Sequence, residues 1–252
     1  MNEQQSGIRV RVVFDLDDTL LAEADKRNRT AFSCASIIIH ELGNQAPYLE
    51  ELLGSQRQHH LRLIQKYGHH PDWYIESWLR AWTDLRIRGA RYVAIAARLR
   101  HAAERCYQSP YILMTGALSV LTTLSQDQRY ELYLVTVGDT KTQSHKLNAC
   151  GLHQFLPSER VFIPPLSKLE PLQQIAGDHP DRAVMIGNSF SSDMDPAIQA
   201  GLLPVWIPCP AIQYYYGDYP SAESVERCTQ LSDIQQVPDL LEAQFFSSPD
   251  TD

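Results

Sequence analysis

The sequence predicts an α/β fold: a doubly wound parallel sheet with a second, smaller domain that is all helical. Short apolar runs of β-forming residues recur along the chain, and helical patterns separate them. This alternation is typical of parallel sheets, because consecutive parallel strands need a long crossover connection. In contrast, residues 22–110 contain long helical patterns and no strand pattern, which indicates a helical insertion after the first strand.

Five runs have the pattern of buried strands. The first, residues 8–14, starts with alternating polarity and ends fully apolar, as expected where both faces of a parallel sheet are covered. The other predicted strands are residues 130–135, 160–163, 183–186 and 203–207, with 160–163 the weakest.

Helices are predicted from apolar spacing and from residues that start or stop a helix. Gly151 and Gly201 follow two of the patterns and suit a helix C-cap, and Pro196 suits an early helical position. Residues 214–216, three consecutive tyrosines, are expected in a loop. The predicted helices are residues 30–42, 49–67, 74–84 and 92–107 in the insertion, and 117–124, 141–150, 169–176 and 196–200 elsewhere.

These elements predict a discontinuous organisation. Residues 1–21 and 111–246 form the α/β core, residues 22–110 form the helical domain, and the polar residues 247–252 form a flexible tail.

Composition and charge narrow the function classes. The 252 residues carry 22 basic and 30 acidic side chains, a formal net charge of -8, which argues against a nucleic-acid partner. An anionic substrate is still allowed, since its binding depends on local charge and metal. The five cysteines are scattered without a C-x-x-C pair, and no apolar stretch is long enough for a signal or a membrane span. We expect a soluble cytoplasmic protein with no membrane partner.

The strongest chemical signal is Asp15-Leu16-Asp17-Asp18-Thr19, directly after the first predicted strand. In an open α/β sheet, ligands bind beyond the carboxyl ends of the strands. Carboxylates at this spacing repel one another unless a cation lies between them. The motif therefore indicates a metal-assisted site.

This D-x-D-x-T motif resembles the first motif of the haloacid dehalogenase-like hydrolases, most of which are phosphatases. The family's second and third motifs, a Ser or Thr after a strand and a later Lys, are matched by Thr136 and Lys168. Its fourth motif is similar to residues 187–193, followed by A-x-x-A-G at 197–201. The resemblance covers residues 8–21 and 112–208 and implies a helical cap at 22–110, which closes over the site and selects the substrate.

One position departs from the family pattern. Asn188 stands where many members have Asp, which keeps an oxygen ligand but removes a charge. Asp193 is then the main acidic group of this loop, and Asn188 is a further candidate metal ligand. Asn188 and Ser189 also suit a helix N-cap, and Thr19 suits either a loop hydrogen bond or a position beside the metal.

Chemistry assigns roles to the motif residues. Asp15 is the candidate nucleophile, since a carboxylate can form an acyl phosphate, and Asp17 is the candidate acid and base. The ligands expected for Mg²⁺ are the Asp15 carboxylate, the Asp17 carbonyl and Asp193. Thr136 and Lys168 suit the phosphoryl oxygens, and the resemblance adds Val137 and Gly138, which directly follow Thr136, to the phosphate-binding residues.

The expected function is hydrolysis of a small organic phosphate, such as a sugar phosphate, a nucleotide or a phospho-acid. A phosphomutase on the same core and a non-catalytic binding protein are the alternatives. A dehalogenase is disfavoured, because the resemblance implies that dehalogenases lack the second aspartate of the first motif, whereas Asp17 is present. No motif in the helical insertion identifies the substrate, and the sequence leaves the oligomeric state open.

Overall fold

The computed structural model describes residues 8–247, so the tail predicted at 247–252 lies almost wholly outside the described residues. Two compact units make up the chain. The α/β unit comprises residues 8–22, Ile112–Val137 and residues 150–247. The helical unit comprises Glu23–Tyr111 and Gly138–Ala149.

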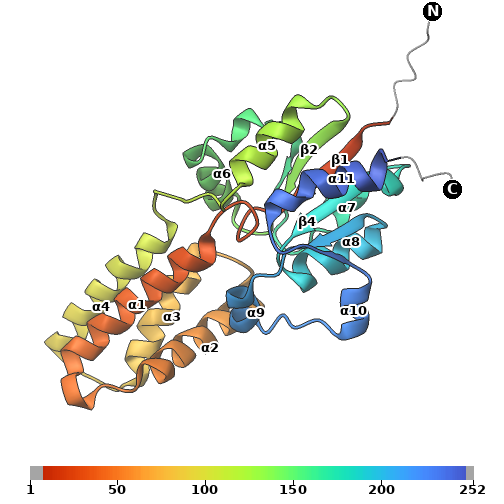
Figure 1. The fold of residues 1–252 in the computed structure, drawn as a ribbon. Helices are drawn as coiled ribbons and strands as arrows, with labels where there is room; N and C mark the ends of the chain where they lie inside the picture. Colours follow the sequence, from red (N-terminus) through yellow and green to blue (C-terminus); the bar gives the residue numbers. More distant parts are fainter. Residues whose placement is uncertain (1–7, 248–252) are drawn as a thin grey trace, which may run out of the picture. The chain divides into compact units, whose positions relative to one another are not determined.

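The α/β unit is built on one parallel sheet of six strands in the order β3-β2-β1-β4-β5-β6 (Figure 1). The predicted fold class is confirmed, and all five predicted strands are present. The sixth was missed because two residues are too short to show a pattern. The strands are β1 Val10–Phe14, β2 Tyr130–Val135, β3 Val161–Phe162, β4 Ala183–Gly187, β5 Leu203–Trp206 and β6 Thr229–Gln230.

The strand register brings the ends of the three central strands level. Phe14, the last residue of β1, pairs with Leu134 in β2 and with Ile186 in β4. The residues that follow these strands therefore emerge at the same carboxyl edge, with Asp15 in the middle. Phe14, Leu134 and Ile186 are fully buried, so the backbone beneath this edge is fixed by core packing.

Helices cover both faces of the sheet (Figure 1). Val13 and Met185 pack with the apolar residues of α7 and α8, whereas α5 contacts β2 and α11. Because successive strand residues point to opposite faces and helices cover both faces, most residues of β1, β2 and β4 are apolar and buried. The helices of this unit are α5 Ala117–Gln126, α7 Leu169–Ala176, α8 Asp195–Ala200, α9 Pro210–Tyr216, α10 Ala222–Glu226 and α11 Val237–Phe245.

The loop prediction for residues 214–216 is wrong, because these tyrosines end helix α9. Pro210 starts the helix and the left-handed Gly217, with a φ of 72°, ends it. Such a short helix shows no apolar periodicity, so only its end signals were readable. Gly151 and Gly201 also adopt left-handed conformations, as their predicted C-cap positions require.

The helical unit contains four long helices and the shorter α6. Helix α1 begins at Glu23, whereas the sequence predicted a start at residue 30. The predicted start was too late because the charged first turns of the helix lack apolar periodicity. Glu23 and Asp25 in the first turn favour helix formation through the helix dipole. The helices are α1 Glu23–Leu42, α2 Leu49–Tyr67, α3 Pro71–Asp84, α4 Ala90–Glu104 and α6 Thr140–Ala149.

A buried ion pair connects α6 to α1 of the helical unit. Nζ of Lys146 lies 3.5 Å from Oε2 of Glu23, and both side chains are almost fully buried. The rings of Tyr111 and His145 also make an edge contact. The sequence had placed this segment in the α/β core from its position between two strands.

Tryptophans form the centre of the helical unit. Trp78 and Trp82 of α3 are fully buried with Ile38 of α1 and Leu99 of α4. Helix α3 starts where His70 Nδ1 accepts a hydrogen bond of 3.2 Å from the backbone of Asp72.

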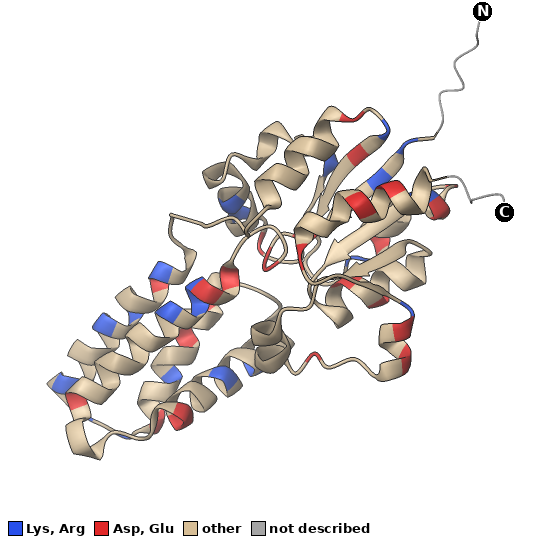
Figure 2. Cartoon of the chain, viewed as in Figure 1, with Lys and Arg blue, Asp and Glu red and all other residues tan. Residues whose placement is uncertain are grey.

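Two observations concern the apolar helices and the distribution of charge in the described part of the chain. Within residues 8–247, no helix is both long and apolar enough to cross a bilayer. In Figure 2, Asp and Glu are spread over the α/β unit, and Lys and Arg of the helical unit are interspersed with acidic residues.

His60 is a buried titratable group in the helical unit. It lies in α2 with 5% of its surface exposed, and its ring meets Tyr74 edge-on at 5.4 Å. Burial lowers the pKa of His60 from 6.5 to about 3, and the positive charge of Arg27 contributes to the shift. His60 is therefore neutral in the folded protein throughout mildly acidic conditions.

This predicts that acid destabilises the helical unit through His60. Between about pH 6.5 and about pH 3 only the unfolded chain binds this proton. The contribution of His60 to the free energy of unfolding is therefore fully present above about pH 6.5 and decreases as the pH falls through this range. The loss should reach about 2 kcal/mol at about pH 5. Urea unfolding should show that acid lowers the free energy of unfolding less in His60→Gln than in the parent protein. In the exposed control His153→Gln, acid should lower it as much as in the parent protein. An equal acid loss in both variants would contradict the assignment.

Candidate active site

The loop after β1 turns back on itself directly beyond the sheet. The backbone N–H groups of Leu20 and Leu21 both donate to the Leu16 carbonyl at 2.9 Å, and Asp18 N–H donates to the Leu21 carbonyl at 2.6 Å. Asp18 has a φ of 62°, a left-handed conformation that Asp tolerates better than most residues. The loop is thus a compact turn that fixes the direction of Asp15 and Asp17.

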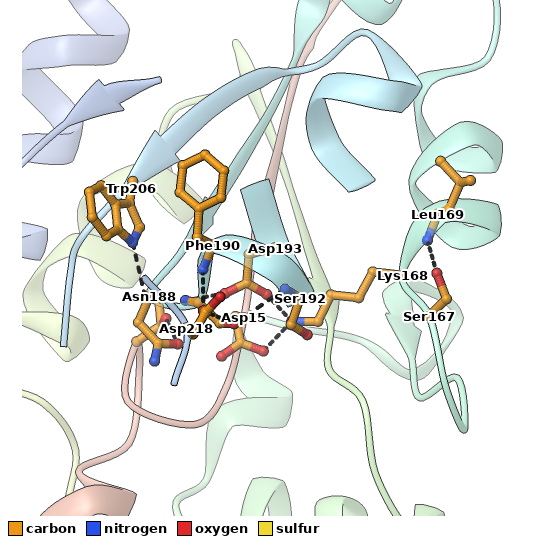
Figure 3. Close-up of polar contacts among 12 residues, drawn as sticks. Asp15, Ser167, Lys168, Leu169, Asn188, Phe190, Ser192, Asp193, Trp206 and Asp218 are labelled. Atoms are coloured by element: carbon orange, nitrogen blue, oxygen red, sulfur yellow. Dashed lines mark hydrogen bonds and ion pairs between the residues drawn. The ribbon is translucent and has the colours of Figure 1, made fainter. Parts of the chain in front are cut away.

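Lys168 joins two of the predicted site residues. It lies at the N-cap of α7 and is 1% exposed. Its Nζ donates to Oδ1 of Asp15 and, at 2.5 Å, to Oδ1 of Asp193 (Figure 3). Three motifs, of which the first and the third are 153 residues apart in the sequence, therefore meet in one buried charge cluster.

The charges in this cluster are not balanced. Burial raises the pKa of Asp15 most, Lys168 lowers it, and the carboxylates of Asp193 and Asp17 raise it, so that it reaches about 7 instead of 3.8. For Lys168, burial lowers the pKa, but the Asp15 and Asp193 carboxylates outweigh this effect and leave the pKa above its ordinary value. One ammonium group faces several carboxylates, and the excess of negative charge favours an additional cation.

The donor set fits Mg²⁺. This ion prefers oxygen ligands and uses one or two carboxylates together with water and phosphate oxygens. Asp15 and Asp193 present carboxylates to the same ammonium group, so they already converge on one positive charge. Asp17 has a main-chain carbonyl in the same turn, and Asn188 has an amide oxygen.

Asn188 follows β4 and is held from two sides. Its side-chain Oδ1 accepts a hydrogen bond of 3.3 Å from Thr19 Oγ1, and its main-chain carbonyl accepts one of 3.0 Å from Trp206 Nε1. Thr19 therefore acts as a loop hydrogen bonder that links the first and fourth motifs. The amide oxygen of Asn188 keeps a second lone pair available as a metal ligand.

Gly187 gives the Asp193 side chain its space. A Cβ added to Gly187 would lie 2.6 Å from Cβ of Asp193, a distance that real atoms do not adopt. Asp193 is 1% exposed, and its Oδ2 accepts a hydrogen bond of 2.9 Å from the Ser189 backbone. Asp195, two residues later, is exposed and does not take part in these contacts.

The remaining predicted residues are less closely connected. Thr136 is buried directly after β2, where its N–H donates to the Phe162 carbonyl at 3.1 Å. Val137 ends this part of the α/β unit, and Gly138 is grouped with the helical unit. Asp17 is half-buried and acts on Asp15 through its charge.

Sequence reasoning missed two residues that contact this site. Trp206 holds Asn188, and Asp218 accepts hydrogen bonds from the loop between Asn188 and Asp193. Neither belongs to a motif, and Asp218 follows the tyrosine run that had been read as a loop. Only the fold brings them to the site.

Comparisons with known proteins identify the family of the chain. A family model described as haloacid dehalogenase-like hydrolase matches residues 11–201 and confirms the resemblance. Glyceraldehyde 3-phosphate phosphatase of Methanopyrus kandleri is 29% identical over 223 residues, covering 78% of this chain and 82% of that protein. Human N-acylneuraminate-9-phosphatase is 28% identical over 218 residues, covering 79% and 83%.

A solved structure supports the fold. A haloacid dehalogenase-like family hydrolase from Xanthomonas campestris superposes with a TM-score of 0.70 at 23% identity, covering 96% of this chain and 94% of that one.

We predict that Gly187→Ala weakens Mg²⁺ binding about tenfold or more, because the new methyl group displaces the Asp193 carboxylate. Isothermal titration calorimetry with Mg²⁺ measures this directly. Gly54→Ala is the matched control, since an added Cβ there meets nothing within 4 Å. Gly54 lies in helix α2 of the helical unit. An unchanged Mg²⁺ titration in folded Gly187→Ala protein would remove Asp193 from the metal site.

Proposed function

We propose a phosphatase function for this chain, which belongs to the haloacid dehalogenase-like hydrolase family. The reaction is Mg²⁺-dependent hydrolysis of a small organic phosphate monoester through a phospho-aspartate at Asp15. The observation that carries the proposal is the buried contact of Lys168 with both Asp15 and Asp193, at the carboxyl edge of the central strand. Relatives named as phosphatases support a phosphoric monoester hydrolase.

Asp15 is suited to attack the phosphorus atom. As its carboxylate forms a bond to phosphorus, the bond from phosphorus to the ester oxygen breaks, and the Asp17 carboxyl gives its proton to the leaving alcohol. Asp17 then takes a proton from the water that attacks the phospho-aspartate, which releases inorganic phosphate and restores Asp15. One residue serves as acid and then as base.

Lys168 and Thr136 are the proposed donors to the phosphoryl oxygens, together with the backbone of Val137 and Gly138. Donors fixed before the reaction stabilise charge on the transferring group without reorganisation. Lys168 meets this requirement, because two hydrogen bonds already fix its ammonium group. Mg²⁺, held by Asp15, the Asp17 carbonyl, Asp193 and Asn188, would supply positive charge between the anionic nucleophile and the anionic substrate.

The helical unit is the proposed cap of the site and the source of substrate selectivity. Its separate core of aromatic and aliphatic residues supports a domain that can move as one body. The two relatives act, by their names, on different phosphorylated compounds, which supports a common core chemistry with variable substrate choice.

The five cysteines are free thiols, which supports a cytoplasmic location.

The test is phosphate release from a panel of phosphorylated metabolites, measured with Mg²⁺ and with EDTA. We expect release from at least one sugar phosphate, nucleotide or phospho-acid, and loss of that release with EDTA. Release that persists in EDTA would refute the metal dependence. No release from any compound, with Mg²⁺ bound, would favour a phosphomutase or a binding protein.

Asp15→Asn should lower phosphate release by about 1,000-fold or more, because the amide cannot act as the nucleophile. Trapping of a phosphoprotein with labelled substrate should disappear in the same variant. Asp195→Asn, an exposed neighbour of the fourth motif, should behave as the parent protein. Undiminished turnover in folded Asp15→Asn protein would exclude the phospho-aspartate.

A further inference from the structure

Asp218 accepts three hydrogen bonds from the loop of the fourth motif. It lies directly after Gly217, the left-handed residue that ends α9. Its Oδ2 accepts hydrogen bonds from Ser189 Oγ at 2.8 Å and from Phe190 N–H at 2.7 Å. Its Oδ1 accepts one from Ser191 N–H at 3.1 Å. Both carboxylate oxygens therefore accept hydrogen bonds from three consecutive residues of the loop. Figure 3 shows the contact between Asp218 and Phe190.

The groups that Asp218 holds are connected to Asp193 through Ser189. The Ser189 hydroxyl donates to Asp218 and accepts from Ser192 N–H at 3.2 Å, which caps the helical turn Phe190–Met194. The Ser189 N–H donates to Oδ2 of Asp193 at 2.9 Å. One residue thus has its hydroxyl on Asp218 and its backbone on Asp193.

We propose that Asp218 is a positioning residue that fixes the loop of Ser189–Asp193 and thereby sets the affinity of the site for Mg²⁺. The inference rests on the proposed function and deepens it. Asp218 acts through the loop, because its oxygens already accept hydrogen bonds from Ser189, Phe190 and Ser191.

The missing charge at position 188 gives this positioning its importance. With Asn188 in the loop, Asp193 is the only carboxylate that the segment 187–193 supplies. Metal affinity then depends strongly on where that single carboxylate is held. Residues that orient metal ligands typically contribute about 10–100-fold to metal affinity.

A second fact makes the role specific to a carboxylate. The three contacts all come from donors, so an acceptor is needed at each oxygen. Asn at this position keeps one acceptor and replaces the other by an NH₂ group, which would face a donor. Asp218→Asn therefore preserves the size of the side chain and breaks at least one of its three hydrogen bonds to the loop.

The experiment measures Mg²⁺ binding to the full chain by isothermal titration calorimetry, without substrate. We expect the dissociation constant for Mg²⁺ to rise about tenfold in Asp218→Asn and in Ser189→Ala. In phosphate release, these variants should need more Mg²⁺, and excess Mg²⁺ should restore kcat while the KM for the substrate stays near that of the parent. Rescue by the metal is a response that a merely structural contact does not give.

Asp233→Ala is the matched control, because Asp233 also caps a short helical turn, by accepting from Gln235 N–H at 2.7 Å, and lies outside the motifs. It should lower the melting temperature and leave Mg²⁺ affinity unchanged. Normal Mg²⁺ affinity in folded Asp218→Asn protein would overturn the inference, even if its melting temperature falls. If the parent binds Mg²⁺ but hydrolyses no phosphate ester, the proposed function fails, and a tenfold shift in Asp218→Asn still supports the positioning role.

Discussion

The ammonium group of Lys168 lies between two buried carboxylates, and the site depends on this balance of charge. Removing charged groups from water is costly unless they are paired and hydrogen-bonded. Lys168 forms ion pairs with both Asp15 and Asp193, so the three groups stabilise one another. Two carboxylates share one ammonium group, so negative charge is in excess. The elevated pKa of Asp15 is the consequence of burial and neighbouring carboxylates. The excess of negative charge makes the cluster receptive to a divalent cation.

The sheet makes this arrangement possible. Strand β1 lies between β2 and β4, and parallel strands end at the same edge, so one central carboxylate has site residues on both sides. The loop after β4 then returns Asp193 against Gly187, where only a hydrogen atom fits. Two residues that come later in the chain form hydrogen bonds with this loop. Trp206 donates to the main-chain carbonyl of Asn188, and Asp218 accepts from the backbone of Phe190. The candidate site thus rests on the sheet and on the segments that follow β4 and β5, rather than on one loop alone.

Most of the framework could be predicted because its signals are local. The buried strand Ala183–Gly187 is a continuous apolar run, and glycines such as Gly201 mark helix ends. The errors occurred where such signals are weak: the charged start of α1, the short aromatic helix α9 and the two-residue strand β6. In these elements, packing against the rest of the unit outweighs local preference.

The sequence by itself determined the fold class, the family resemblance and the identity of the motif residues Asp15, Thr136, Lys168 and Asp193. Their order and their positions after strands carry that information along the chain. Only the tertiary structure decided that Lys168 contacts both aspartates, that Thr19 holds Asn188, and that Asp218 holds the loop. These contacts join residues up to 169 positions apart. Neither spacing nor composition encodes them, because they arise when parallel strands bring distant segments to one edge of the sheet.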